Sequence, residues 1–412
     1  MFDSKRARST KPIVIAILLA ILALSGCIGP RGWPGVVADG DTVYVGSMGG
    51  KVFRLEVSAR LQDKDEDKPE LSERDGEWLW EPAEEGGGGL LSCGQAGQFG
   101  AGALYGPPAV GNVTVRNETV AAVFVGTYSG KVYAITEYRD EVWDEPFDTG
   151  GNIIGGVAVA NDTLFVGSSN GKLYAVDIST GRAKQGFDPY RTGAKIVSTP
   201  VVQGGVVYFG SLDHKLYAID AATGKLKWDF TTGGGIGSPP LIEKDVLDRD
   251  VLYFGSFDSK FYAVYADSGG PKWERPFEAG NWFWSEALHH DGIIYVCSLD
   301  HNVYAIDAES GKLTTRWSPN PFPTEDQIRS SPVIVGEAGE EVLVVASEDG
   351  KVYGLYLENG GEKWQIDLES SILAPLCAAD DMVYVNGRND DKLYAFDSEG
   401  NQIWSVSLRD IK

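Results

Sequence analysis

The sequence is poor in cysteine, methionine and histidine, with 4, 3 and 4 of these residues among 412. The cysteine spacing matches no metal-binding motif. Apart from Cys27, the cysteines could form at most one disulfide. We expect Cys297 and Cys377, which fall within apolar sequence, to be buried as small hydrophobic residues, and Cys93, in glycine-rich sequence, to be a free thiol.

Positive charge is also scarce, because 36 Lys and Arg residues face 59 Asp and Glu residues, for a formal net charge of -23. A strongly acidic chain is repelled by phosphate backbones and by anionic lipid surfaces. The composition therefore excludes nucleic acid as a partner, and the acidity is interpreted as a means of solubility.

Catalytic motifs are absent as well: no Ser-His-Asp arrangement, glycine-rich phosphate loop or zinc-ligand spacing can be assembled. Alternating aspartates at 63–67 begin like a calcium-binding loop. Lys68 and Arg74, however, stand where such a loop requires glycine and a bidentate glutamate. We interpret this segment as a solvated acidic insertion, with weak calcium binding as the alternative, and expect no catalytic residue, metal or cofactor.

The first 26 residues differ from the rest of the chain. A basic start at Lys5, Arg6, Arg8 and Lys11 precedes an apolar stretch, 12–24, that is too short for a comfortable membrane span. The stretch ends in Leu-Ser-Gly-Cys at 24–27, which resembles a bacterial lipobox. Residues 1–26 are therefore predicted to be a lipoprotein signal peptide, Cys27 the site of lipid attachment, and 27–32 a tether; an uncleaved signal anchor is the alternative.

The remaining sequence is dominated by one repeated unit. Each copy has two alternating strand segments around a short turn of Gly, Asp, Asn or His, which is the chemistry of a tight β-hairpin. With 52 glycines and evenly spread aromatic residues, the chain is predicted to be all-β. The eight copies occupy 43–56, 123–135, 164–177, 207–220, 252–265, 294–307, 343–356 and 383–397.

Each hairpin is predicted to form the middle of a four-stranded antiparallel sheet. A short segment opened by Ser or Thr and Pro would be the inner strand, and a segment carrying a tryptophan, such as Trp228 or Trp273, the outer strand. Sheets of about 40 residues arranged radially are propeller blades. Residues 33–408 are thus predicted to form an eight-bladed β-propeller, with an acidic insertion at 58–76, Trp78 and Trp80 on the delayed outer strand of the first blade, and a Gly-rich loop at 86–102.

The pattern A-x-D-x-x-T-G-x-x-x-W, complete from Ala218 to Trp228, resembles the tryptophan-docking repeat of pyrroloquinoline-quinone (PQQ) propellers. Together with the lipobox, it makes the chain similar to BamB-type lipoproteins. The resemblance implies a non-enzymatic, membrane-anchored scaffold of the cell envelope, with a propeller face that binds envelope proteins and a possible role in outer-membrane protein assembly. The alternative that it implies is a PQQ-dependent quinoprotein dehydrogenase, although the adjacent cysteines common in soluble members are missing here.

The most unusual stretch is 281–286, Asn-Trp-Phe-Trp-Ser-Glu, which precedes the hairpin of the sixth blade. Strand alternation would place Trp282 and Trp284 on one side and Phe283 on the other. We expect at least one of these rings to pack between blades. The three residues are the candidate contacts for a partner or for a ligand such as a glycan.

Overall fold

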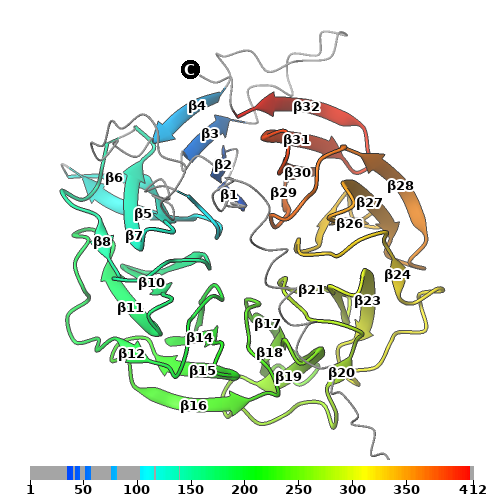
Figure 1. The fold of residues 1–412 in the computed structure, drawn as a ribbon, viewed down its shortest axis with the longest axis horizontal. Helices are drawn as coiled ribbons and strands as arrows, with labels where there is room; N and C mark the ends of the chain where they lie inside the picture. The colour runs from blue at the N-terminus through cyan, green and yellow to red at the C-terminus, as the bar shows by residue number, and fades with distance from the viewer. Residues whose placement is uncertain are drawn as a thin grey trace, which may run out of the picture.

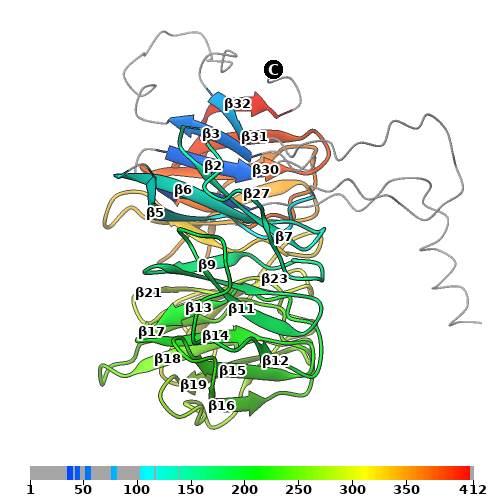
Figure 2. The same ribbon diagram turned by 90° about the vertical axis from the view of Figure 1, so that its left-hand side faces the viewer.

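The computed structural model describes residues 35–39, 42–46, 52–56, 76–80, 103–115, 117–138 and 140–408. They form eight four-stranded antiparallel sheets around a central axis, with the first sheet beside the eighth (Figure 1). In side view, the strands run roughly across the thickness of the disc (Figure 2). The prediction of an all-β, eight-bladed propeller is confirmed.

Each sheet uses four consecutive strands, so no described strand is exchanged between the first and the last sheet. Blades one to four contain β1 (Val36–Asp39), β2 (Thr42–Gly46), β3 (Val52–Glu56) and β4 (Gly76–Trp80); β5 (Ala109–Val115), β6 (Glu118–Gly126), β7 (Lys131–Thr136) and β8 (Phe147–Asp148); β9 (Val157–Ala160), β10 (Thr163–Gly167), β11 (Lys172–Asp177) and β12 (Tyr190–Arg191); β13 (Val201–Gln203), β14 (Val206–Gly210), β15 (Lys215–Asp220) and β16 (Leu226–Thr231).

The other four blades repeat this order from the inner strand to the outer one. They contain β17 (Leu241–Lys244), β18 (Asp250–Gly255), β19 (Lys260–Tyr265) and β20 (Phe277–Glu278); β21 (Leu288–His290), β22 (Ile293–Cys297), β23 (Asn302–Asp307) and β24 (Phe322–Pro323); β25 (Val333–Val335), β26 (Val342–Ala346), β27 (Lys351–Tyr356) and β28 (Glu362–Asp367); β29 (Cys377–Ala379), β30 (Met382–Gly387), β31 (Lys392–Asp397) and β32 (Gln402–Ser407).

The second strand of a blade lies at the centre of the packing. All five residues of β10, β14, β22 and β26 are buried, because both faces of the sheet are covered by neighbouring blades. Val, Ile, Tyr and Phe suit such positions, since branched and aromatic side chains fill a pleated surface well. Two of the hairpin turns contain His214 and His301, and both residues have a positive φ.

The outer strands are either two residues long or five to six residues long, and a preceding proline marks the short ones. Blades two, three, five and six have outer strands of two residues, each directly preceded by a proline, whereas the outer strands of blades four, seven and eight have six residues and no proline. Proline has no N–H for the ladder and cannot extend it. Trp228 therefore lies on an outer strand, as predicted. Trp273 and Trp317 instead lie in the loops before the outer strands β20 and β24, so the prediction that the tryptophan lies on the outer strand is wrong for these two blades.

Tryptophan side chains link successive blades. Five indole Nε1–H groups donate hydrogen bonds of 2.7 to 3.0 Å to carbonyl oxygens of the following blade, from Trp143, Trp228, Trp273, Trp317 and Trp364 to Ile178, Ala266, Ala308, Leu357 and Ser398. The rings also cover turn glycines of that blade. A Cβ on Gly269, for example, would lie 2.7 Å from the Trp228 ring, and its φ of +69° already disfavours other residues.

A second link joins the hairpin of one blade to the preceding blade. Asp300 in the turn of blade six accepts hydrogen bonds of 2.6 Å from both the Tyr304 hydroxyl and the backbone N–H of Gly280, which follows β20 of blade five. Asp258 makes the same pair of contacts one blade earlier, and Asp213 makes it two blades earlier. Because the repeat supplies both residues, the joint recurs around the ring.

The first and eighth blades meet through an apolar cluster. Val36, Val43 and Phe53 of blade one pack with Tyr384 and Trp404 of blade eight, and all five are buried. The ring therefore closes by side-chain packing between complete sheets.

Several predicted features lie outside the described residues: the leader at 1–26, Cys27, the tether at 27–32, Cys93, most of the acidic insertion at 58–76 and the Gly-rich loop at 86–102. They remain predictions. The predicted outer strand of blade one is present as β4. No helix in the described parts of the chain is long and apolar enough to cross a membrane. Cys297 is buried and Cys377 is half-buried, and neither forms a disulfide.

Candidate central cavity

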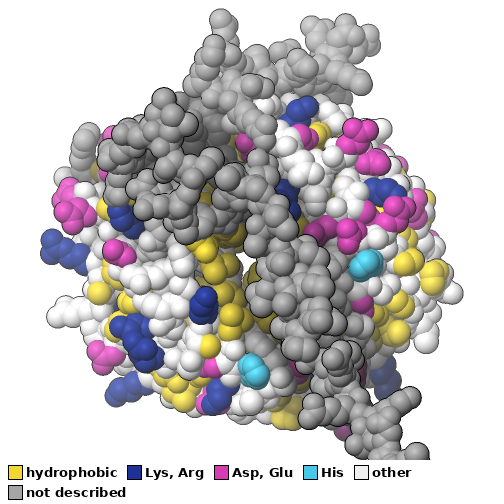
Figure 3. Space-filling view, viewed as in Figure 1, with side chains coloured by type: hydrophobic (Ala, Val, Ile, Leu, Met, Phe, Trp, Pro, Cys, Tyr) yellow, Lys and Arg dark blue, Asp and Glu magenta, His cyan; other side chains and the backbone are white. Residues whose placement is uncertain are grey.

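All eight blades contribute to a cavity of roughly 340 Å³ on the axis of the ring. Its wall comes from the segments that lead into the inner strands, and most of the lining side chains are apolar, such as Ile154, Leu241 and Leu373. Figure 3 shows hydrophobic side chains bordering the hollow at the centre of the face. A concave, mainly apolar site with a few polar groups is the usual form of a ligand site.

Glycine allows the inner segments to approach one another closely. A Cβ on Gly106 would lie 2.2 Å from the backbone nitrogen of Gly156 in the next blade, and one on Gly155 would lie 2.7 Å from the Ser198 carbonyl carbon. These contacts are between backbones, which cannot move aside as a flexible side chain can. The wall of blades two to four is therefore formed largely by tightly packed backbone.

Glu286 is the acidic side chain in the described wall of the cavity. Its surface is mostly covered by protein, and this desolvation raises the pKa of its carboxyl group to about 7. No described cation forms an ion pair with it, and burial alone accounts for the shift. Its backbone N–H donates a 3.2 Å hydrogen bond to the Ser331 hydroxyl, which holds the segment against blade seven.

Ser285 precedes Glu286 and also lines the cavity. Its side chain is buried, and its Oγ has no hydrogen-bond partner within the described structure. The serines at the same position in blades four, five and seven are paired: Ser198, Ser238 and Ser330 donate to the backbone carbonyls of Gly210, Gly255 and Ala346. An unpaired buried hydroxyl is uncommon and calls for an explanation.

Arg329 is the basic side chain in the described wall. Its Nε donates a 2.5 Å hydrogen bond to Glu348, and an NH2 group donates one of 3.1 Å to the Gln327 side chain. The guanidinium also lies over the Trp284 ring, 5.9 Å from its centroid. The positive charge of Arg329 is thus already paired with Glu348.

A stack of aromatic rings extends from the cavity wall towards the surface. Phe257 of blade five is stacked against Trp282 at a centroid distance of 4.7 Å and against Trp284 at 5.5 Å, with interplanar angles of 18° and 6°. Trp282 is 44% exposed, whereas Trp284 is half-buried and lines the cavity. The two tryptophans therefore lie on the same side of the segment, as alternation predicts.

Phe283 points the other way and is completely buried. It packs between blades five and six with Phe261 and Tyr304. Gly255 makes room for it, since a Cβ there would lie 2.2 Å from the Phe283 Cβ. Phe283 thus holds the segment in place, and a direct contact role stays a prediction for Trp282 and Trp284.

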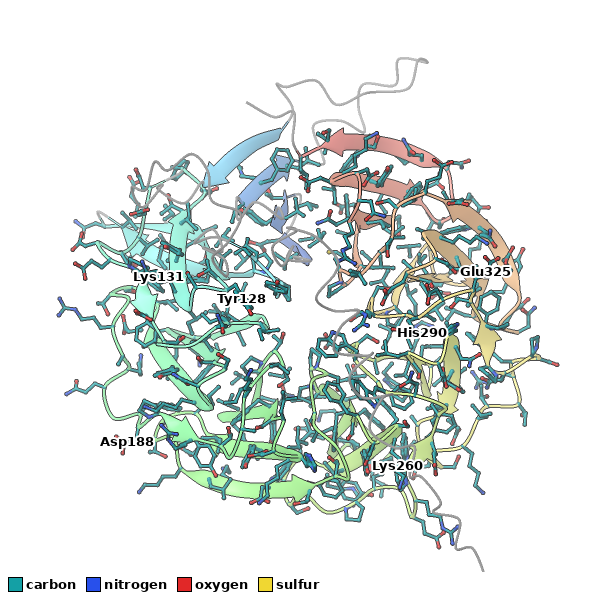
Figure 4. All side chains as sticks on the ribbon, viewed as in Figure 1. Tyr128, Lys131, Asp188, Lys260, His290 and Glu325 are labelled. Carbon is teal, nitrogen blue, oxygen red and sulfur yellow. The ribbon has the colours of Figure 1, made fainter. Side chains whose placement is uncertain are left out.

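Two histidines on the inner strand β21 face carboxylates on either side. His289 lies 3.5 Å from Glu243 of blade five, and His290 lies 4.0 Å from Glu341 of blade seven. Figure 4 shows His290 nearer the centre of the ring than Asp188 or Glu325. Among the described residues, no group of three or more His, Cys, Asp or Glu side chains is arranged to hold a metal ion.

Sequence reasoning singled out the aromatic stretch but missed the roles of Glu286, Arg329 and Phe257. One feature of the repeat could have revealed Glu286. After the serine that opens the inner segment, blades four, five and seven have Thr199, Pro239 and Ser331, and blade six has a glutamate. Arg329 and Phe257 come from the blades on either side, so a search within one repeat does not connect them to it.

Comparison with known proteins gives one family. The family model described as "Outer membrane protein assembly factor BamB" matches residues 128–317 and 299–410. No curated protein matches the chain in sequence.

Two solved structures share the fold. BamB from Moraxella catarrhalis is 17% identical, with 73% of this chain and 85% of that chain covered and a TM-score of 0.56. The computationally designed protein Ika8 is 13% identical, with 87% and 95% covered and a TM-score of 0.60. At these identities the likeness concerns the fold alone, and one of the two structures is a designed protein.

Proposed function

This chain belongs to the family of PQQ-like repeat propellers described as outer membrane protein assembly factor BamB, and from that premise we propose that it is a non-enzymatic scaffold of the cell envelope. In this proposal it binds other envelope proteins through a face of the propeller and is held at a membrane by a lipid on Cys27. A part in outer-membrane protein assembly is the specific role that the family description suggests.

The observation that carries the proposal is the family match over most of a closed ring of eight blades. Tryptophan and aspartate links join neighbouring blades, so the loops of the propeller have a firm support. Such a ring presents a broad surface with little loss of conformational entropy on binding. Among its loops, the segment with the exposed Trp282 is the contact that we assign to a partner, since exposed aromatic residues are enriched at binding surfaces.

The quinoprotein alternative concerns the central cavity. A quinone bound with calcium needs several oxygen ligands, and the described wall offers one carboxylate, Glu286, and one guanidinium, Arg329, that is already paired. The described residues do not fit that group. Reduction of a dye by the purified protein with PQQ, calcium and an alcohol or sugar would nevertheless overturn the scaffold proposal.

The test of the scaffold is a crosslinked pulldown of the lipidated, full-length protein from its native membranes, followed by mass spectrometry. We expect β-barrel assembly components among the captured proteins. A different envelope complex would retain the scaffold but remove the assembly role, and capture of no envelope protein under these conditions would contradict the proposal.

The contact residue can be tested in the same experiment. Trp282→Ala is expected to reduce partner recovery severalfold, whereas Tyr138→Ala, which removes another exposed aromatic ring in blade two, is expected to leave it unchanged. A glycan array with the same two variants tests the ligand alternative: loss of a glycan signal in Trp282→Ala alone would assign the aromatic stack to sugar binding.

The lipid anchor needs a separate measurement. Labelling cells with an alkyne fatty acid is expected to mark the wild-type protein and Cys93→Ser but not Cys27→Ser, and Cys27→Ser should leave the membrane fraction. Equal labelling of all three proteins would remove Cys27 as the attachment site.

A further inference from the structure

We propose that the central cavity binds a protonated amine on an apolar stem, with the Glu286 carboxylate as its counter-ion. This inference goes beyond the scaffold function and does not depend on it. The apolar stem would lie against the apolar side chains that the other blades contribute to the cavity wall.

The first observation is the charge in the cavity. Glu286 lies in a mainly apolar wall, and no described cation is paired with it. The nearby guanidinium of Arg329 is engaged by Glu348 at 2.5 Å. Because a buried carboxylate without a counter-ion is costly, a ligand that brings one positive charge gains a strong interaction there.

The second observation is the match between the hydrogen-bonding groups of an amine and those of the wall. An ammonium group has three N–H donors and no acceptor. It can therefore donate to the oxygens of the Glu286 carboxylate, for which the described wall supplies no cation. The Ser285 hydroxyl takes no part, because its oxygen is completely buried.

The third observation is how firmly the segment is held. Phe283 is buried between blades, Trp284 contacts both the Phe257 ring and the Arg329 guanidinium, and the N–H of Glu286 donates to Ser331. The segment that carries Glu286 is thus fixed before a ligand arrives, and preorganisation of this kind favours affinity. The cavity volume of roughly 340 Å³ accommodates a small organic amine or the end of a lysine side chain.

The test uses three probes of similar size and different charge on the full-length protein at pH 8: phenethylamine, 2-phenylethanol and phenylacetate, measured by isothermal titration calorimetry. We expect the amine to bind at least tenfold more tightly than the alcohol, which is about 1.4 kcal/mol, and phenylacetate not to bind. Equal affinities for the amine and the alcohol, or no binding of any probe at millimolar concentration, would overturn the proposal.

Two variants assign the preference to the carboxylate. Glu286→Gln should abolish the preference for the amine over the alcohol, whereas Ser285→Ala, which removes a completely buried hydroxyl next to it, should keep that preference. Glu278→Gln, on the exposed outer strand β20, is the matched control and should behave as wild type. An unchanged amine preference in Glu286→Gln would exclude the carboxylate as the counter-ion.

The source of the amine is distinguished by a second pair of probes. A short peptide with one central lysine and the same peptide with acetylated lysine compete for bound phenethylamine. Displacement by the lysine peptide alone indicates that a partner's side chain can enter the cavity, whereas binding of the free amine without displacement by either peptide indicates a small-molecule ligand.

Discussion

The outer part of the propeller and its centre follow different rules. At the outer part, the same residues make the same contacts in blade after blade, as the hydrogen bonds of Trp228 and Trp273 to the following blades illustrate. At the centre, each blade contributes a different short segment, and blade six departs most, with Ser285 and the carboxyl group of Glu286 in a mainly apolar wall. The comparison indicates that the repeat secures the ring, while departures from the repeat produce the site.

The largest expected effect comes from breaking a link at the outer part. Trp273 is buried and donates a 3.0 Å hydrogen bond to Ala308 in the next blade. Trp273→Ala removes a large ring and one hydrogen bond, so we expect the free energy of unfolding in urea to fall by about 3–5 kcal/mol. A loss below about 1 kcal/mol would mean that the tryptophan links contribute little to holding the blades together.

The next largest effect is the pH dependence of stability that Glu286 in the cavity wall produces. The folded state raises the pKa of Glu286 from 4.5 to about 7, so the folded protein binds this proton more tightly than the unfolded chain. This contribution to stability is fully present below pH 4.5 and is lost as the pH rises through 7. Between pH 5 and pH 8, wild type should therefore lose on the order of 2 kcal/mol more than Glu286→Gln.

Urea unfolding at both pH values measures this difference. Glu278→Gln, which replaces an exposed carboxylate, should follow the wild-type pH dependence. Parallel behaviour of wild type and Glu286→Gln would show that Glu286 titrates as an ordinary carboxyl group and would place it outside the desolvated wall.

A smaller effect is expected at the aspartate link. Tyr304→Phe removes the hydroxyl that donates to Asp300, while the Gly280 N–H remains bonded to the same carboxylate. Loss of one hydrogen bond to a charged group should cost about 1–2 kcal/mol. Tyr356→Phe, at an exposed tyrosine, should cost close to nothing in the same assay.

The smallest effect is expected at the exposed end of the aromatic stack. Trp282 is 44% exposed and contacts Phe257 through one face. Trp282→Ala should lower the free energy of unfolding by about 1 kcal/mol, the value of an aromatic pair. A loss as large as that of Trp273→Ala would show that Trp282 is a structural residue and would argue against its role as a contact.

The hairpins of the blades could be predicted from the sequence because they depend on residues that are close together in the chain. A hairpin depends on strand segments with alternating side-chain character and on turn residues such as Gly171 or His214. Both recur at a regular period in the sequence. The same reasoning failed for Trp273 and Trp317 because it ignored the prolines that shorten their outer strands. That information was present in the sequence, since Pro276 and Pro321 directly precede those strands.

The contacts around the central cavity were harder to predict from the sequence because they join residues of different blades. The alternation of Trp282, Phe283 and Trp284 followed from strand geometry, but the ring of Phe257 and the guanidinium of Arg329 come from neighbouring repeats. Their meeting depends on how far each blade is rotated relative to the next, which no single repeat encodes. The raised pKa of Glu286 arises from the same tertiary arrangement.

Because each blade supplies its own part of the cavity wall, the lining residues of one blade can be changed without changing those of another. A substitution in one inner segment alters one side of the wall and leaves the tryptophan and aspartate joints between the sheets intact. New combinations of lining residues can therefore be tried one segment at a time on an unchanged frame. The residues that line the cavity can in this sense be varied independently in each blade.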